Sequence, residues 1–235
     1  EKQKQFLVSQ QALAQWQQYT ARIQAFEQQA KLQQQQQQLP KHHEQDNASL
    51  LYDTVGAICV DANGNVSAGV SSGGLAMKYV GRIGEAAMFG AGCWASNKQN
   101  VATSCSGTGE SIMLSLLAKH VADALSSEQA INELPEVTIS KVMDDFKSVH
   151  HNSSIPNYAG VIALKQREDY GSDESNSEDA QNTEQTSRNY DFIWTFNTES
   201  FAVAYFTSDM EDAVAAVHYN SNNKKPCFNV GVINL

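Results

Sequence analysis

Four short motifs in the middle of the chain carry hydroxyl, guanidinium and carboxylate side chains among glycines. In chain order they are Asp53-Thr-Val-Gly-Ala57, Val70-Ser-Ser-Gly-Gly-Leu-Ala76, Gly81-Arg-Ile-Gly-Glu85 and Ser106-Gly-Thr-Gly-Glu110. A threonine or serine hydroxyl is a weak nucleophile that needs an adjacent base, whereas a planar guanidinium is suited to binding a carboxylate. Each motif alone is weak, and an isolated Thr54 would be an ordinary residue at the start of a strand. Their combination and order along the chain are the more specific feature.

This order of motifs resembles the type 2 asparaginase family of N-terminal nucleophile hydrolases. Within that family the chain is most similar to the threonine aspartase (taspase) branch, through the first two motifs together with Gly92-Cys-Trp-Ala95 and Thr198-Glu-Ser200. The resemblance covers roughly residues 50–206. It implies an α+β fold, a four-layer αββα sandwich, in a precursor that cuts itself between Asp53 and Thr54. The products would be an α subunit ending at residue 53 and a β subunit that begins with the nucleophile.

The chemistry implied for Thr54 follows from its position at a new N-terminus. A terminal amine has a pKa of about 8 in unstructured peptides, so part of it is unprotonated near neutral pH. Nucleophile and base then sit on one residue, which lowers the entropic barrier to reaction. Before cleavage the same nitrogen belongs to an amide and is unable to act as the base. Activation by autoproteolysis is therefore built into the proposed site.

The resemblance assigns supporting roles to four further positions. Ser72 would hydrogen-bond the amine or hydroxyl of Thr54 and orient them. Ser106 and Gly107 match the segment that stabilises the tetrahedral oxyanion, through a hydroxyl and a backbone N–H. Gly109 would permit close approach of the backbone to the substrate. No cofactor and no metal enters this chemistry.

Substrate recognition is assigned to two charged residues. Arg82 matches the family arginine that holds a substrate carboxylate as a bidentate pair. Glu85 stands where the family usually has Asp, and would bind a substrate amine or orient Arg82. If Arg82 held the side-chain carboxylate of an internal Asp, Thr54 would attack the main-chain carbonyl. That geometry predicts a threonine endopeptidase that cleaves proteins after Asp, and cleavage after Asp53 is the same specificity in cis.

Alternative interpretations remain open at this stage. One is an L-asparaginase or isoaspartyl peptidase, in which the arginine holds the α-carboxylate and the threonine attacks the side-chain amide. Another is a truncated, inactive chain that acts through its Gln-rich helix. Family members have a long segment before the nucleophile that supplies part of the sheet. Because only 53 residues precede Thr54 here, we expect the N-terminal portion of the sheet to be absent.

The resemblance also implies partners and a compartment. The expected partners are protein substrates with an internal Asp, in particular transcription regulators, and the two subunits of an α/β heterodimer. Two heterodimers would pair in some members. The expected location is the cytoplasm or the nucleus. Four cysteines, at positions 59, 93, 105 and 227, form no CxxC or zinc spacing, which agrees with reduced thiols.

Charge argues against two classes of partner. The 235 residues carry 16 Lys and Arg against 26 Asp and Glu, a formal net charge of −10, which disfavours nucleic acid and anionic membranes. Residues 1–53 hold five basic and five acidic side chains, so the whole excess belongs to residues 54–235. A metal site at His42-His43 or His150-His151 is disfavoured, because adjacent histidines point in different directions on a helix or strand.

The elements that must position the motifs can be predicted from periodicity. Apolar residues spaced by three or four from Leu13 to Ala30 predict an amphipathic helix within the Gln-rich residues 4–38. Residues 55–60 and 66–71 predict a hairpin around Asn63-Gly64. The other expected elements are helices at 112–125, 128–134 and 139–149, a strand at 160–164, and a hairpin from 192–196 and 201–206. Residues 165–191, with eight acidic against three basic side chains, predict a disordered insertion.

Overall fold

The computed structural model describes residues 10–35, 54–75, 78–149, 157–167, 189–220 and 229–234. The chain divides into two compact units. We call Glu1–Tyr52 with Gly74–Arg82 the N-terminal unit, and Asp53–Gly73 with Ile83–Leu235 the sheet unit. None of the helices among the described residues is long and apolar enough to cross a membrane.

The N-terminal unit contains a single long helix among its described residues. This helix, α2 (Gln10–Gln35), confirms the element predicted from the apolar spacing. Leu13, Trp16 and Ile23 belong to the predicted apolar face, and their side chains are 47, 54 and 45% exposed. Within the N-terminal unit, these three side chains are therefore only partly covered.

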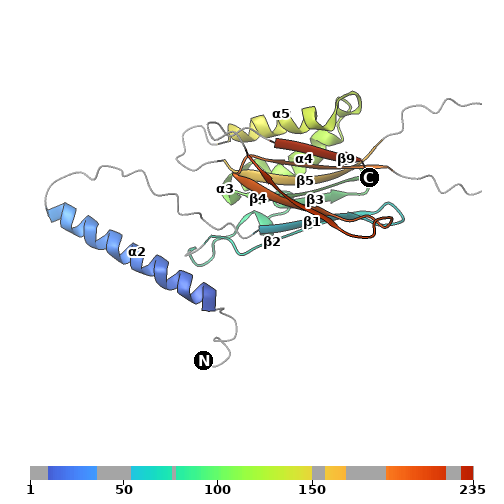
Figure 1. Ribbon diagram of the computed structural model, residues 1–235. Coiled ribbons are helices and arrows are strands. Elements are labelled where there is room, and N and C mark those ends of the chain that lie inside the picture. The colour runs from blue at the N-terminus through green and yellow to red at the C-terminus, as the bar shows by residue number, and fades with distance from the viewer. Residues whose placement is uncertain are drawn as a thin grey trace, which may run out of the picture. The chain divides into compact units, whose positions relative to one another are not determined.

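The sheet unit is built around five antiparallel strands in the order β3-β4-β5-β6-β9. Their bounds are β3 (Cys93–Ser96), β4 (Val101–Gly107), β5 (Ala159–Gln166), β6 (Tyr190–Phe196) and β9 (Asn229–Asn234). Three helices cover one face, namely α3 (Gly109–Ser115), α4 (Leu117–Leu125) and α5 (Pro135–Lys147) (Figure 1). Fully buried residues such as Ile112, Val121, Met143, Phe146 and Ile193 join helices and sheet in one core.

The opposite face of the sheet carries two strand pairs. One is β1 (Thr54–Val60) with β2 (Val66–Ser72), and the other is β7 (Ser200–Tyr205) with β8 (Val214–Tyr219). A second core of buried and half-buried side chains, including Val66, Ala102, Leu164, Phe192 and Val203, joins these pairs to the sheet. The α+β class is thus confirmed, with a helix layer, a sheet and a strand-pair layer. The fourth layer and the missing portion of the sheet stay predictions.

The hairpin β1–β2 approaches β4 unusually closely at one glycine. A Cβ added at Gly56 would lie 2.3 Å from Ser104 Oγ and 2.9 Å from Ser104 Cβ. From the other side, the Ser104 hydroxyl donates to the carbonyl oxygen of Gly69 on β2 at 3.2 Å. The absent side chain at Gly56 therefore lets the hairpin lie directly on the sheet.

The predicted single helix at 112–125 is wrong, because two helices meet at Leu116. Leu116 has a left-handed backbone, with φ of 47° and ψ of 49°. The break frees the first amides of α4 for another partner. Ala118 N–H donates to the carbonyl of Ala91 at 3.2 Å, and Lys119 N–H donates to that of Gly90 at 2.9 Å. Hydrogen bonds to the carbonyls of a distant loop thus take the place of the backbone hydrogen bonds that would continue a single α-helix.

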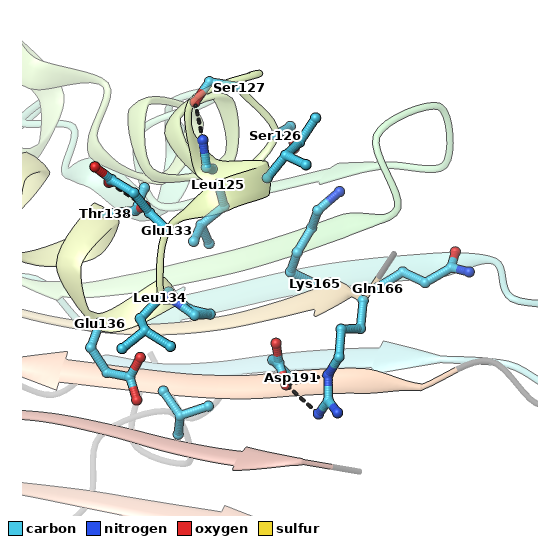
Figure 2. A pocket seen from close by; sticks show the side chains of 15 residues that line it. Leu125, Ser126, Ser127, Glu133, Leu134, Glu136, Thr138, Lys165, Gln166 and Asp191 are labelled. Carbon is cyan, nitrogen blue, oxygen red and sulfur yellow. Dashed lines mark hydrogen bonds and ion pairs between the residues drawn. The ribbon is translucent and has the colours of Figure 1, made fainter. Parts of the chain in front are cut away.

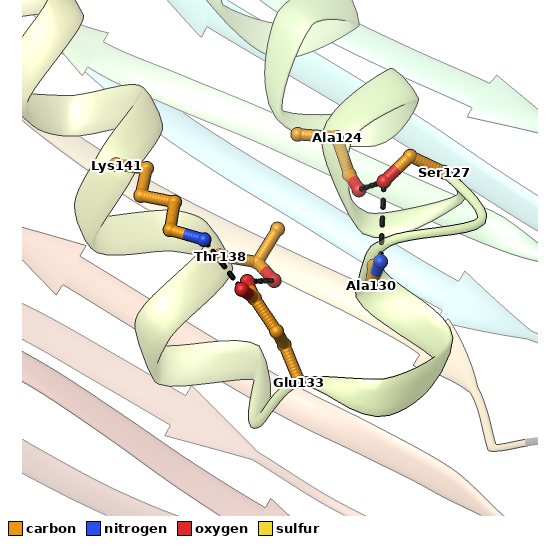
Figure 3. A network of polar contacts seen from close by, with 6 residues as sticks. All are labelled: Ala124, Ser127, Ala130, Glu133, Thr138 and Lys141. Atoms are coloured by element: carbon orange, nitrogen blue, oxygen red, sulfur yellow. Dashed lines mark hydrogen bonds and ion pairs between the residues drawn. The ribbon is translucent and has the colours of Figure 1, made fainter.

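The predicted helix at 128–134 is a short 3₁₀ turn, η2 (Ala130–Asn132), and the next helix starts four residues earlier than predicted. Pro135 at the first turn of α5 disfavours a helical backbone at the residue before it. Figure 3 shows the polar contacts that hold this corner. The Ser127 hydroxyl donates to Ala124 O at 2.8 Å, and Glu133 accepts from Thr138 Oγ1 and from Lys141 Nζ.

The predicted hairpin from 192–196 and 201–206 is also wrong, although both strands exist. β6 pairs with β5 and β9, whereas β7 pairs with β8 in the other layer. The buried Asn197 marks the change of layer. Its side-chain oxygen accepts from Ala159 N–H at 2.7 Å, and its amide donates to Asn157 O at 2.7 Å. These bonds satisfy the backbone where the chain leaves the sheet.

The bounds predicted for the acidic insertion are too wide. β5 extends to Gln166 and β6 begins at Tyr190, with Lys165 opposite Asp191 in the register. Arg167 Nη2 forms an ion pair of 2.6 Å with Asp191 Oδ1. Residues 168–188 lie outside the described part of the chain, so the predicted disorder stays untested. Strands β3, β4, β8 and β9 had no sequence prediction.

The close approach at Gly56 gives a direct test of the layer contact. Gly56→Ala should lower the free energy of unfolding by about 1–3 kcal/mol, the usual cost of overpacking. Adding Ser104→Gly should recover part of this loss in a double-mutant cycle, because the atoms that clash are then gone. Gly69→Ala is the matched control, since a Cβ there meets no atom within 4 Å. Equal effects of the two alanine variants in chemical denaturation would contradict the packing described.

Candidate active site

Thr54 and Ser72 face each other at the open end of the β1–β2 hairpin. They are paired residues in the antiparallel register, and a hydrogen bond of 2.9 Å joins Thr54 Oγ1 to Ser72 Oγ. Burial alternates along both strands, so Thr54 shares the inner face with Gly56, Ile58 and Val60. The two-residue period of a strand therefore directs the hydroxyl inward. The pairing of the two predicted hydroxyls follows from the five-residue loop that sets this register.

Glu85 reaches the same hydroxyl from a different element. It opens the 3₁₀ turn η1 (Glu85–Ala87) and is only 3% exposed. Its Oε1 accepts from Thr54 Oγ1 at 3.3 Å. One hydroxyl proton serves one acceptor at a time, and a carboxylate only accepts. Both contacts are satisfied together when Thr54 donates to Glu85 and the Ser72 hydroxyl rotates to donate to Thr54.

The backbone around Glu85 is fixed by a second close approach. A Cβ added at Gly92 would lie 2.7 Å from the carbonyl oxygen of Glu85 and 2.9 Å from Val70 Cγ1. The missing side chain lets η1 pack against β2 and the start of β3. Gly92 belongs to a motif noted in the sequence, but its spatial relation to Glu85 comes only from the fold.

Ser106 and Gly107 lie at the same end of the sheet unit as Thr54. The other end of the hairpin is tied to the start of β4, because Val66 N–H donates to Asn97 Oδ1 at 2.8 Å. Ser104 contacts the middle of the hairpin, so Thr54 and Ser72 point toward the end of β4. By alternation with Ala102 and Ser104, Ser106 lies on the hairpin side of the strand. The turn η1 packs against both β2 and α3, which begins at Gly109.

Gly107 has a backbone that suits glycine alone. Its φ is 147°, and an added Cβ would lie 2.1 Å from the carbonyl oxygen of Tyr158. Next to it, Thr108 N–H donates to Tyr158 O at 2.8 Å, and Tyr158 N–H donates to Thr108 Oγ1 at 3.2 Å. The end of β4 is thus held rigidly against the start of β5. The oxyanion role of Ser106 and Gly107 stays a prediction.

For two of the predicted site residues the structure gives no position relative to this cluster. Arg82 belongs to the N-terminal unit, where its Nη1 lies 3.2 Å from the position that a Cβ at Gly74 would occupy. Its role in binding a carboxylate stays a prediction. Asp53, the residue before the predicted scissile bond, lies outside the described residues, as do the four histidines considered for a metal site.

Two thiols lie near Glu85, the half-buried Cys93 and the buried Cys105, and no role in the site was predicted for them from the sequence. Burial raises the pKa of the Cys105 thiol strongly, and the nearby Cys93 and the negative charge of Glu85 raise it further. Burial also raises the pKa of Cys93. Cys105 is only 2% exposed, so the packed interior on this side of Glu85 excludes water. Among the described residues no group of three or more His, Cys, Asp or Glu side chains could hold a metal ion.

A hollow of about 430 Å³ lies at the other end of β5 (Figure 2). It is lined by the end of α4, the start of α5 and the ion pair Arg167–Asp191. At this end of β5, Lys165 lies opposite Val101 of β4. At the end of β5 that is nearer the Thr54 cluster, Ala159 lies opposite Gly107. Six residues of strand separate these ends, about 20 Å. This hollow is therefore distinct from the Thr54 cluster.

A hydroxyl held by a second hydroxyl and a buried carboxylate, at the edge of a layered α+β unit, defines a candidate nucleophile. The family profile described as asparaginase matches residues 1–194. Because this match covers most of the chain, the chain belongs to that family of N-terminal nucleophile hydrolases. The coarse sequence prediction of a hydrolase of the type 2 asparaginase family is confirmed.

The similar curated proteins are isoaspartyl peptidases and asparaginases. The chain is 46% identical over 69 residues to an isoaspartyl peptidase of Escherichia coli, which covers 29% of this chain and 21% of that protein. It is 36% identical over 115 residues to a plant-type L-asparaginase of Pyrobaculum calidifontis, covering 49% and 36%. An isoaspartyl peptidase/L-asparaginase of Xenopus laevis is 44% identical over 81 residues, covering 33% and 26%. The chain thus spans a fifth to about a third of the length of these relatives.

None of these three relatives is named as a threonine aspartase, so they do not support the narrower resemblance to that branch. Their names correspond to the interpretation that the sequence left as an alternative.

The thiols test the exclusion of water beneath Glu85. Native chain treated with iodoacetamide near neutral pH should be alkylated first at the exposed Cys59, later at the half-buried Cys93, and last at Cys105. The thiolate is the reactive form, and a raised pKa keeps Cys105 protonated at that pH. Peptide mass mapping measures the order, with unfolded chain as the control in which all three react. Equal rates for Cys59 and Cys105 in native chain would contradict the burial described.

Proposed function

We propose that this chain carries the nucleophile of an N-terminal threonine hydrolase of the isoaspartyl peptidase/L-asparaginase kind. The observation that supports it most is the contact of Thr54 Oγ1 with both Ser72 Oγ and Glu85 Oε1, at 2.9 and 3.3 Å. A surface threonine at the start of a strand would not meet a second hydroxyl and a buried carboxylate. The family match and the names of the relatives support the same conclusion.

Cleavage between Asp53 and Thr54 would complete the site. In the uncleaved chain the Thr54 nitrogen shares its lone pair with the carbonyl of Asp53 and has no basic character. Once free, the amine takes the hydroxyl proton while Oγ1 attacks the amide carbon of the substrate. Ser72 keeps Oγ1 oriented, and the Ser106 hydroxyl with the Gly107 N–H would stabilise the oxyanion. The carbon–nitrogen bond of the substrate then breaks, and the protonated Thr54 amine returns its proton to the leaving amine or ammonia. Water hydrolyses the remaining ester and frees the Thr54 hydroxyl.

The substrate follows from the relatives and from Arg82. Isoaspartyl peptidase and L-asparaginase are the names of the similar proteins. Both activities require attack on the side-chain amide of an aspartyl unit whose α-carboxylate is free. A guanidinium fits that carboxylate as a bidentate partner, which is the role proposed for Arg82. We therefore propose β-aspartyl peptides and L-asparagine as the substrate class.

A second candidate function has the same nucleophile, Thr54, but a different class of substrate. The residue before Thr54 is Asp53, so the cleavage that activates the site would itself occur after an Asp. An enzyme that holds the side-chain carboxylate of an internal Asp and attacks its main-chain carbonyl would repeat this reaction in trans. This observation favours the threonine endopeptidase of the aspartase branch, acting on proteins.

The first test is self-cleavage. Intact mass spectrometry of purified chain should show fragments 1–53 and 54–235, because the Thr54 hydroxyl attacks its own preceding peptide bond. Thr54→Val should remain whole, since it keeps the shape of the side chain and removes the hydroxyl. Thr54→Ser should still cleave, more slowly, because it keeps the nucleophile without the β-methyl group that restricts its rotamer. Cleavage of the valine variant would contradict Thr54 as the nucleophile.

The second test separates the two candidate substrates. Cleaved chain should hydrolyse a β-aspartyl dipeptide and L-asparagine, and should leave intact a peptide with an internal Asp-Gly bond. The reverse pattern would contradict the proposed substrate class and support the endopeptidase. Arg82→Ala should lower kcat/KM for either substrate by about tenfold or more, the effect of losing a charged hydrogen bond. Thr54→Val is the inactive control for both assays.

A further inference from the structure

Glu85 faces the nucleophile in this structure, whereas the family resemblance assigns its position to substrate binding or to Arg82. Its side chain is almost completely buried, and Oε1 lies 3.3 Å from Thr54 Oγ1. A buried carboxylate is costly unless it is hydrogen-bonded. Among the described residues Thr54 is the partner that supplies this bond. The contact therefore calls for a function that involves the hydroxyl itself.

The precursor lacks the base that the mature enzyme would use. As long as Thr54 is joined to Asp53, its nitrogen is a planar amide. The hydroxyl nevertheless has to lose its proton when it attacks the preceding carbonyl. Of the described residues that contact Thr54 Oγ1, Ser72 is a neutral hydroxyl and Glu85 is the titratable group. A general base has to lie within hydrogen-bond reach of the proton it takes, and Glu85 satisfies that condition.

We propose that Glu85 is the general base of the self-cleavage reaction, an inference that rests on the proposed function. Its carboxylate takes the proton of the Thr54 hydroxyl as Oγ1 bonds to the carbonyl carbon of Asp53. The carbon–nitrogen bond then breaks, and the carboxylic acid of Glu85 returns the proton to the departing Thr54 nitrogen. The ester between the Asp53 acyl group and Thr54 Oγ1 is hydrolysed by water. The products are the Asp53 carboxylate and a Thr54 with free amine and hydroxyl.

The structure also accounts for the length of this side chain. The family usually has Asp at the position of Glu85, which is shorter by one carbon–carbon bond, about 1.5 Å. The close approach at Gly92 fixes the backbone of Glu85, so a shorter side chain would place its carboxylate beyond contact with Thr54. Glu85 and Asp at this position are therefore not equivalent for the first reaction. This predicts that Glu85→Asp slows self-cleavage although the charge is retained.

The test follows the rate of self-cleavage by intact mass spectrometry in the purified chain. Glu85→Gln should cleave about 10²–10⁴-fold more slowly than wild type, the usual contribution of a general base. Glu128→Gln, at an exposed glutamate of the same unit, is the matched control and should cleave at the wild-type rate. Thermal melting confirms that each variant is folded. A folded Glu85→Gln chain that cleaves at the wild-type rate would overturn the proposal.

Chemical rescue distinguishes a base from a packing residue. Glu85→Ala leaves a space next to Thr54, so added formate should raise its cleavage rate in proportion to concentration. Chloride at equal ionic strength is the control and should have no effect. This comparison is made within one variant, so it does not depend on differences in stability between variants. A rate that is the same in formate and chloride would show that Glu85 acts only through packing.

A pre-cut chain separates this proposal from the proposed function. Residues 47–53 are replaced by a recognition sequence after which a site-specific protease cuts, so that Thr54 becomes an N-terminus without self-cleavage. If the pre-cut chain hydrolyses substrate and Glu85→Gln still cleaves normally, Thr54 is the nucleophile but Glu85 is not the base. If neither the pre-cut chain nor wild type shows any reaction, the proposed function fails.

Discussion

The fold of the sheet unit depends on how closely one hairpin lies against one strand. Gly56 has no side chain where Ser104 crosses it, and the Ser104 hydroxyl bonds the backbone of the opposite hairpin strand at Gly69. This contact fixes both the distance between the layers and the position of β1 along β4. The open end of the hairpin is thereby directed to the end of β4. Thr54, the proposed nucleophile, its hydroxyl partner Ser72 and the proposed oxyanion segment share that end for this reason.

The same constraint explains why the site is assembled from distant segments. Thr54 and Ser72 come from the hairpin, Glu85 from η1, and Ser106 from the end of β4. Glycines at 56, 92 and 107 each stand where a Cβ would come within 3 Å of another atom. Their absent side chains permit close packing of β1 on β4, of η1 on β2, and of the end of β4 on the start of β5. Cys105, which lies close enough to Glu85 for its negative charge to raise the pKa of the thiol, is only 2% exposed.

A carboxylate next to the proposed nucleophile would divide the chemistry into two stages. In the precursor the nitrogen of Thr54 is unable to accept a proton, and Glu85 is the base proposed for that stage. After the proposed cleavage, the free amine would act as the base for substrate turnover. One site would thus perform an intramolecular and an intermolecular hydrolysis with the same nucleophile. The names of the relatives, isoaspartyl peptidase and asparaginase, concern the second stage, the hydrolysis of a substrate. Asp53, the residue before Thr54, concerns the first stage, the proposed self-cleavage.

From the sequence by itself, the order of motifs identified the family by resemblance, and that resemblance implied the α+β class. Local periodicity and turn residues predicted helix α2 and the β1–β2 hairpin. The sequence also identified Thr54, Ser72 and Glu85 as candidates. Only the tertiary structure decided that the late strands enter different layers, that the helix breaks at Leu116, and that Glu85 faces the nucleophile. Each of these depends on partners far along the chain, such as Asn157 for Asn197 and the loop carbonyls of Gly90 and Ala91 for α4. Sequence spacing does not encode such long-range contacts, because they arise only when separate elements pack together.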